Sequence, residues 1–482
     1  MMDLRPIIYI VGRILAVLAI LMLAPALIDW RLDNGNASAF LQSAIIAGAT
    51  GVTLSLATGN SLGQPLDARQ AYLLTVLIWG FVPLVGALPL MIGAPHLGLT
   101  DAYFEAVSGI TTTGASVITG LDAAPAGMNL WRGMLNWLGG LGIAFIAMIF
   151  LPVMRVGGMQ FFRTEGFDTF GKVLPRATDI ARQLLFVYAG LTLACVLVYA
   201  GLGMVPLDAV VNGFATIATG GFSSSDLSFA KYEGAPEYAG ALFMFLGSLP
   251  YIRFVQLVNG SARPLLRDWQ VQSYALWLGT AVLMVTIWRW VSHGGAFEPI
   301  FRATLFNLTS IMSSTGFFSQ DFATWGGFML VIAFAVGTIG ACSGSSAAGL
   351  SVFRVQISMA ALRQQIRLIA RPSTVSVLRY EGRRVDRTVI DAVAVYVAGF
   401  ILILGLMTVG MTLVGVDLES ALFGVWTSLG NIGYGFGPMV QATGTFIDFP
   451  TPAKWIMILA MLLGRLGLLA ILVIALPRFW RR

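Results

Sequence analysis

Long apolar runs, separated by shorter polar segments, extend along almost the whole chain. A run of about 20 apolar residues is enough for a helix to cross a bilayer. The predicted crossings are 8–29, 38–58, 71–94, 130–153, 184–204, 239–260, 273–292, 326–352, 389–414 and 453–476. The first run is interpreted as a retained helix rather than a signal peptide, because it is long and a second run follows at once. The pattern therefore predicts an all-α integral membrane protein.

Four of the segments between crossings resemble one another. They read FEAVSGITTTGAS at 104–116, VVNGFATIATGGFS at 210–223, FNLTSIMSSTGFF at 306–318 and FGVWTSLGNIGYG at 423–435. We align them on one glycine each, at Gly114, Gly220, Gly316 and Gly433. A second glycine recurs in each following helix, at Gly139, Gly247, Gly340 and Gly464. The repeating unit is thus a helix, a short half-helix, a glycine turn and a returning helix.

The repeat divides the chain into five parts. These are two N-terminal transmembrane helices (1–60), repeat 1 with a cytoplasmic loop (61–182), repeat 2 (183–271), repeat 3 with a broken inner helix and a cytoplasmic loop (272–387), and repeat 4 (388–482). We expect four pseudo-symmetric helix–pore-helix–helix units around a central pore, preceded by the two extra helices.

Composition and charge set the orientation. Only 11% of the residues are charged and 57% are hydrophobic, which excludes an ordinary soluble domain. The net charge is +6, and arginines gather after the fourth, sixth and eighth crossings and at the C-terminus. The positive-inside rule places these loops and both termini in the cytoplasm. Such arginines mark topology or contact lipid headgroups, and no nucleic-acid partner is expected. Cys195 and Cys342 lie in apolar segments and indicate no disulfide framework.

The glycine turns are the candidate site. Irregular backbone survives at membrane depth only when it is buried in protein or lines a watery cavity. Four converging turns can point carbonyl oxygens at a cation, and glycine accepts the φ > 0 that this requires. No carboxylate lies inside a turn, which favours a monovalent ion. The predicted filter residues are Thr112, Thr113, Gly114, Thr219, Gly220, Gly221, Thr315, Gly316, Phe317, Asn431, Ile432, Gly433 and Tyr434.

The glycines and the acidic residues near the turns can each be interpreted in a second way. Close helix packing is the alternative for any single turn, and it is the favoured role of the second glycine set, Gly139, Gly247 and Gly464. Acidic residues near the turns, at Asp101, Glu105 and Asp226, are either a cation-concentrating mouth or solvated loop charge.

A gate is predicted below the turns. The third inner helix contains GTIGACSGSSAAGLS at 337–351, where helix propensity is poor, and Arg465 lies near mid-bilayer, where a guanidinium needs a partner or a function. The candidate gate residues are Gly340, Ala341, Cys342, Ser343, Gly344, Ser345, Ser346 and Arg465. The alternatives are a kinked packing helix, and an arginine that caps the carbonyls of that broken helix.

These motifs resemble those of the Trk/Ktr/HKT superfamily of potassium transporters, and most of all its bacterial TrkH-type subunits. TTTGAS, ATGGFS, SSTGF and NIGYGFGP match the four filter turns, and LLGRLG matches the late arginine motif, with Gly467 where relatives often carry a carboxylate. The resemblance implies potassium as the transported ion, with no covalently bound cofactor. It places potassium at Thr113, Gly114, Thr219, Gly220, Thr315, Gly316, Ile432 and Gly433.

The same resemblance implies a homodimer in the bacterial inner membrane and cytoplasmic TrkA-like nucleotide-binding regulatory subunits. These subunits would dock on the basic loops at 155–182 and 354–387. An enzyme is not expected, because the chain has only His96 and His293, no Cys/His metal cluster and no phosphate loop. A proton- or sodium-coupled secondary transporter with broken helices stays open as the alternative.

Overall fold

The computed structural model describes residues 2–61, 66–145, 177–373, 377–467 and 476–480. These residues are mainly helical, and their strands form a two-stranded antiparallel hairpin of β1 (Arg379–Tyr380) and β2 (Arg383–Arg384). The prediction of an all-α chain is therefore confirmed for its architecture.

Six helical stretches among the described residues are long and apolar enough to cross a membrane. They are built from α1 (Arg5–Leu21) with α2 (Leu23–Arg31), α3 (Ala37–Ala57), α4 (Ala68–Gly86) with α5 (Leu88–Ile92), α10 (Ala177–Gly201), α15 (Trp269–His293) and α19 (Arg387–Leu413). Their outer faces leave large apolar side chains exposed, for example Leu56 at 78% and Leu413 at 81%. Such faces suit contact with lipid rather than with water.

Four shorter helices lie inside this assembly. They are α6 (Leu99–Ile110), α11 (Pro206–Ala218), α16 (Phe297–Met312) and α20 (Leu418–Leu429). At 12 to 16 residues they span only about 18–24 Å and cannot cross a bilayer alone. Their C-terminal halves are almost wholly buried. Each one follows a long helix and ends at one of the predicted glycine turns.

Four helices return from the turns: α7 (Ala126–Phe145), α12 (Ala235–Gly247), α17 (Gly327–Ile339) and α22 (Thr451–Leu466). The segment predicted to cross at 239–260 is not one straight helix, because α12 meets α13 (Tyr251–Val258) at a 93° bend. Pro250 is the N-cap of α13; proline lacks the N–H that a continuous helix needs and disfavours helical backbone at the residue before it. The interruption predicted at 337–351 is observed, since α17 ends at Ile339 with Gly340 as its C-cap, and helix resumes at α18 (Val352–Ala370).

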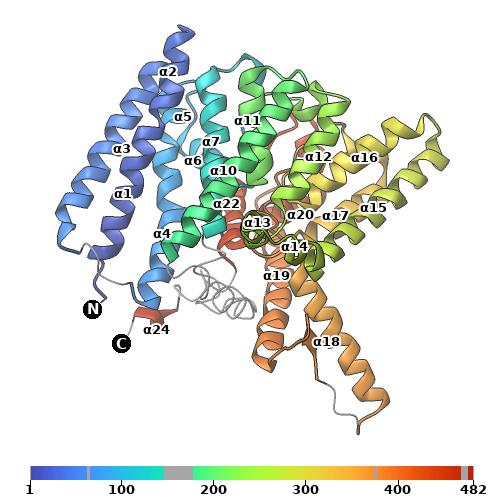
Figure 1. Cartoon of the computed structure of the whole chain (residues 1–482). Coiled ribbons are helices and arrows are strands. Elements are labelled where there is room, and N and C mark those ends of the chain that lie inside the picture. The colour runs from blue at the N-terminus through green and yellow to red at the C-terminus, as the bar shows by residue number, and fades with distance from the viewer. Residues whose placement is uncertain (1, 62–65, 146–176, 374–376, 468–475, 481–482) are drawn as a thin grey trace.

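The arrangement separates two faces (Figure 1). The N- and C-termini lie on the same side, where α18 and α19 also project away from the other helices. The described part also contains three short α-helices, α14 (Arg263–Arg267), α21 (Pro438–Gln441) and α24 (Pro477–Trp480), and several single turns of 3-10 helix. Helix α22, near the end of the chain, packs against α6 near its beginning, while α7 packs against α11. The first contact brings the fourth unit beside the first, and the second contact brings the first unit beside the second.

Candidate functional site: four glycine turns in a ring

The four short helices end in the same way. A backbone N–H just beyond each helix donates a hydrogen bond of 2.8 Å to a carbonyl five residues earlier. These bonds are Thr113 N to Ser108 O, Gly220 N to Ala215 O, Thr315 N to Ser310 O, and Ile432 N to Thr427 O. The four segments that look alike in sequence thus fold alike.

Backbone dihedral angles fix the equivalent positions. Left-handed residues come first, with φ of 50°, 51°, 54° and 48° at Thr112, Thr219, Ser314 and Asn431. Two residues later are left-handed glycines, with φ of 82°, 72°, 84° and 92° at Gly114, Gly221, Gly316 and Gly433. The alignment on Gly220 is therefore wrong by one residue in the second turn. The glycine pair at 220–221 fits either register in sequence, and only the backbone distinguishes them.

The turns contact one another in cyclic order. A Cβ atom added to Gly114 would overlap the carbonyl oxygen of Gly220, and one on Gly221 would overlap that of Thr315. In the same way Gly316 abuts Ile432 O, and Gly433 abuts Thr113 O. Each glycine thus meets the carbonyl of the residue that precedes the glycine of the next turn. The fourth turn returns to the first, so the ring is closed.

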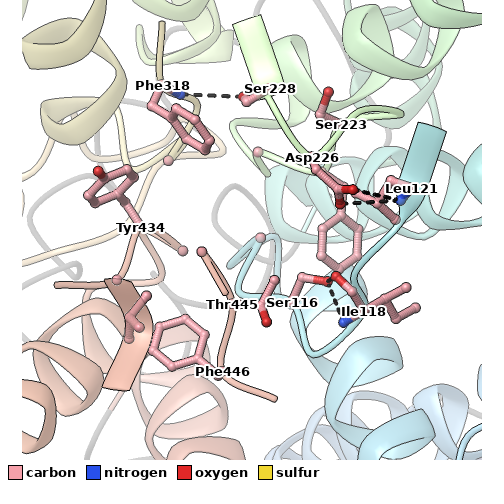
Figure 2. A pocket seen from close by; sticks show the side chains of 18 of the residues that line it. Ser116, Ile118, Leu121, Ser223, Asp226, Ser228, Phe318, Tyr434, Thr445 and Phe446 are labelled. Carbon is pink, nitrogen blue, oxygen red and sulfur yellow. Dashed lines mark hydrogen bonds between the residues drawn. The ribbon is translucent and has the colours of Figure 1, made fainter. Parts of the chain in front are cut away.

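The ring forms the floor of a cavity of about 260 Å³ lined by all four glycines (Figure 2). Aromatic rings of Phe318, Tyr434 and Phe446 stand around it. Two carboxylates line it: Asp321 accepts a hydrogen bond from Tyr434, and Asp226 accepts from the backbone N–H groups of Gly120 and Leu121. Carboxylates above uncharged carbonyls make this entrance attractive to cations.

Glu105 is not part of that entrance. It is fully buried and pairs with Arg132 at 2.8 Å, and the Arg132 side chain is 1% exposed. The same guanidinium donates to Ser223 O at 2.9 Å and lies 4.2 Å from the centre of the Phe222 ring. Because Glu105 belongs to α6 and Ser223 follows the second turn, this buried ion pair holds two neighbouring turns together. Asp101 likewise pairs with Lys454, at 2.7 Å.

The interrupted segment of the third unit lies directly beneath the ring. Ser346 Oγ is within 3.1 Å of Ile217 O, 3.2 Å of Gly247 O and 3.3 Å of Thr219 Oγ1. The backbone N–H of Ala348 donates to Ser314 Oγ at 2.7 Å. The predicted gate segment therefore touches the second and third turns.

Arg465 reaches the same region from α22. Its Nε donates to Thr111 O at 2.7 Å, and its buried Nη2 has no hydrogen-bond partner among the described residues. A cavity of about 80 Å³ is lined by Arg465 together with Gly344, Ser345 and Ala348. The alternative prediction was that Arg465 caps carbonyls of the broken third helix. Arg465 does cap a carbonyl, but it is that of Thr111, just after α6 of the first unit. Gly467, at φ 78°, ends α22.

The second glycine set allows close packing, as predicted. A Cβ on Gly139 would overlap Ile110 O, and one on Gly464 would overlap Leu429 O. At Gly247 the nearest atom to such a Cβ is Ile217 O, at 3.0 Å. The returning helices thus press against the ends of the short helices that precede them.

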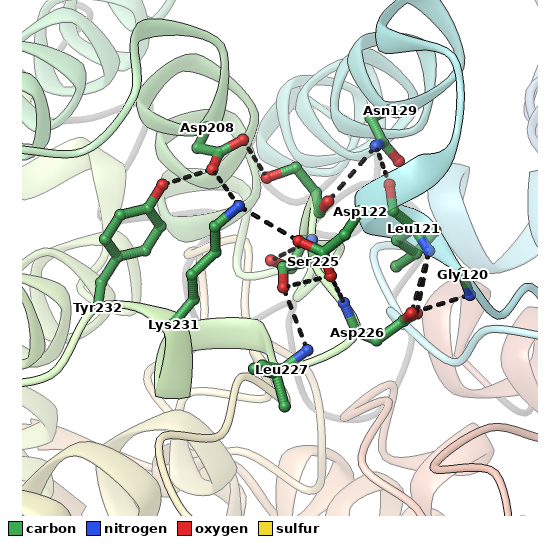
Figure 3. A network of polar contacts seen from close by, with 12 residues as sticks. Gly120, Leu121, Asp122, Asn129, Asp208, Ser225, Asp226, Leu227, Lys231 and Tyr232 are labelled. Carbon is green, nitrogen blue, oxygen red and sulfur yellow. Dashed lines mark hydrogen bonds and ion pairs between the residues drawn. The ribbon is translucent and has the colours of Figure 1, made fainter.

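A polar network that the sequence did not predict joins the loops after the first two turns (Figure 3). Lys231 Nζ lies 3.2 Å from Asp122 Oδ1 and 3.0 Å from Asp208 Oδ2, and Tyr232 donates to Asp208. Burial raises the pKa of both carboxyl groups, but their hydrogen bonds outweigh burial and the pKa of each is lowered. Ser225 is one such donor to Asp122, at 2.8 Å. Asp122 and Asp208, which Lys231 bridges, are more than 80 residues apart in sequence, so no local pattern predicts that they share a partner.

A multi-pass helical protein whose short helices end in a ring of carbonyl oxygens has the architecture of a membrane transport protein for cations. The family model TrkH, described as a cation transport protein, matches residues 36–482. The chain belongs to the TrkH family, which is a family of transporters and not of enzymes.

Relatives match along the whole chain. The Trk system potassium uptake protein TrkI of Halomonas elongata is 39% identical over 99% of this chain and 97% of its own length. The Trk system potassium uptake protein TrkH of Escherichia coli K12 is 32% identical, with full coverage of both chains. The crystal structure of the potassium transporter TrkH from Vibrio parahaemolyticus superposes with a TM-score of 0.91 at 30% identity, also over both full chains.

Proposed function

We propose that this chain carries potassium ions into the cell across the bacterial inner membrane, through the ring of glycine turns. The cyclic contact of each glycine with the carbonyl of the next turn is the observation that carries the proposal. The relatives' names, which include potassium uptake protein and potassium transporter, agree with it. Both termini lie in the cytoplasm on this proposal, on the side where arginines gather.

Selectivity arises from backbone oxygens. Carbonyls held in a ring replace the hydration shell of a monovalent cation without the tight chelation that carboxylates would give. The four oxygens that abut the ring glycines belong to Thr113, Gly220, Thr315 and Ile432. Together with the neighbouring turn residues they form the potassium sites, and the four units are pseudo-symmetric repeats about this pore. Ser314, at the left-handed position of the third turn, joins the predicted set.

The gate lies on the cytoplasmic side of the ring. The segment from Gly340 to Ser351 is tied to the turns by Ser346 and Ala348, and Arg465 adds a positive charge close to the first turn. A fixed cation below a cation filter opposes passage. Movement of this segment and of Arg465 away from the path opens it.

Control comes from cytoplasmic partners. Exposed arginines of α18 and the β1–β2 hairpin, among them Arg363, Arg367, Arg383 and Arg384, lie on the projecting part of the molecule. We assign this surface to TrkA-like nucleotide-binding subunits and expect the chain to act as a homodimer. The other proposed docking loop, 155–182, lies mostly outside the described residues.

Flux through the reconstituted protein tests the proposal. We expect a current that reverses at the potassium equilibrium potential and does not shift with the proton or sodium gradient. A shift with either gradient would instead support a coupled secondary transporter, the alternative reading.

The filter itself is tested at Gly114, where a serine would crowd Gly220 O. We expect Gly114→Ser to raise the sodium-to-potassium flux ratio. Gly120 is the matched control, because it is also left-handed, at φ 77°, but a Cβ there meets nothing within 4 Å. An unchanged ratio in Gly114→Ser would remove this turn from the filter.

A further inference from the structure

A cavity beside the first unit shares no lining residue with the cavity above the ring of turns. Its volume is about 490 Å³ and its walls come from α1, α4 and α7, a size within the range of roughly 300–1,000 Å³ typical of small-molecule sites. The lining is almost wholly apolar, with Arg13 and the indole of Trp79 among its few polar groups. An apolar cavity facing a bilayer suits a hydrocarbon chain.

Arg13 gives this cavity a charge. It lies eight residues into α1, so about 12 Å from the start of the helix. Val17 and Ile20, on the same helical face, are 55% and 66% exposed, which places Arg13 on a face turned toward lipid. Within the described residues Arg13 has no ion pair, and the aromatic ring beneath it is Tyr9, at 5.9 Å. A cation on such a surface is costly unless an anion meets it.

Trp79 supplies a second polar group without a protein partner. The side chain is 2% exposed, and its buried Nε1 has no hydrogen-bond acceptor among the described residues. An unpaired indole N–H in an apolar wall is unfavourable unless an acceptor arrives from outside. The ester oxygens of a glycerolipid are acceptors of this kind.

We propose that the cavity binds one anionic phospholipid of the membrane. Arg13 pairs with the phosphate, the Trp79 N–H meets an ester oxygen, and one acyl chain fills the space beside α7. An anionic headgroup such as phosphoglycerol is preferred because nothing offsets its phosphate charge, whereas a zwitterionic headgroup also carries a cation.

The bound chain touches the support of the first turn. Ile110, the last residue of α6, lines the cavity together with Gly139, and Gly139 abuts the carbonyl of Ile110. The next residue, Thr111, accepts the hydrogen bond from Arg465. Occupancy therefore steadies the base of the first turn, and transport depends on the lipid.

Native mass spectrometry of the full chain tests this, with phosphatidylglycerol and phosphatidylcholine of identical acyl chains as probes. We expect wild-type protein to retain phosphatidylglycerol preferentially. Arg13→Gln should lower that retention on the order of fivefold, the effect of one basic residue at a membrane surface. Arg5→Gln is the matched control, because Arg5 begins the same helix but does not line the cavity.

A second variant tests the binding of the acyl chain separately from the binding of the headgroup. A Cβ on Gly142 would lie 4.0 Å from Trp79, in ordinary contact, so Gly142→Leu fills the cavity without backbone conflict. We expect it to reduce retention of both lipids and to lower rubidium uptake into phosphatidylglycerol vesicles. Equal retention of the two lipids by wild type, or unchanged retention in Arg13→Gln or Gly142→Leu at unchanged thermal stability, would overturn the proposal.

Discussion

Each glycine of the ring meets two separate demands. One is conformational, because φ values of 72° to 92° are costly for a residue with a Cβ. The other is spatial, because the next turn's carbonyl occupies the place of that Cβ. Sequence spacing predicted the turns but aligned the second one on Gly220 instead of Gly221, since both demands arise only in the folded ring. Arg132 shows the same limit, because its partners Glu105 and Ser223 come from two units.

The register of the second turn predicts that alanine is tolerated differently at Gly220 and at Gly221. Gly221→Ala places a Cβ against Thr315 O and strains the left-handed backbone, which costs roughly 1–2 kcal/mol before any clash. Gly220→Ala meets only the side chain of Asn136, at 2.6 Å, and keeps a permitted φ. We expect Gly221→Ala to reduce rubidium uptake and the melting temperature more than Gly220→Ala. The opposite ranking would restore the alignment on Gly220.

At the scale of secondary-structure elements, some helices could be predicted from their own sequence and others could not. The long helices follow directly from apolar runs, because a bilayer imposes their length. The short helices emerge only from comparison among the four units. The bend at Pro250 was missed because the apolar run continues through it, and hydropathy does not register a change of direction. The interrupted segment at 337–351 was predicted from its glycines and serines, whereas its contacts with the second and third turns were not.

Those contacts predict how the segment resists opening. Ser346→Ala removes one hydroxyl donor, which lies within reach of both Ile217 O and Gly247 O and contributes about 1 kcal/mol. We expect a several-fold rise in rubidium flux at unchanged ion preference, and the same direction for Arg465→Ala. Ser345→Ala is the matched control, because Ser345 Oγ donates to Cys342 O within the segment itself. Unchanged or lower flux in a folded Ser346→Ala protein would contradict the gate.

At the scale of the whole molecule, segments that are far apart in the sequence pack against each other. Helix α22 packs on α6, and Asn431 of the fourth turn donates to Thr113 of the first at 2.8 Å. The sequence predicted four units, but their cyclic contact and the Lys231–Asp122 pair of the outer network depend on partners more than 80 residues apart. On the outer side, the Asp122–Lys231–Asp208 network adds a second link between the first two units.

This network predicts a pH dependence. The pKa of Asp122 and Asp208 is lowered and that of Lys231 is raised. The stabilisation is therefore complete above the usual carboxyl pKa of about 3.9, and it is lost as pH falls through the lowered values. Because Lys231 and Asp122 are 36% and 47% exposed, each pair contributes less than about 1 kcal/mol.

Lys231→Gln provides the measurement. We expect its melting temperature to lie slightly below that of wild type by a constant margin between about pH 5 and 9, and the two to converge near pH 3. A margin that persists in acid would show that Lys231 acts through packing rather than through its charge.

Because the ring is built by one polypeptide and not by four identical chains, its quarters are free to specialise. The third quarter carries the long break between α17 and α18, the second carries the sharp bend between α12 and α13, and the fourth carries Arg465. A tetramer of identical subunits would have to repeat every such device four times around its axis. Because one chain supplies all four repeats, each repeat around the shared pore can carry a different structural feature.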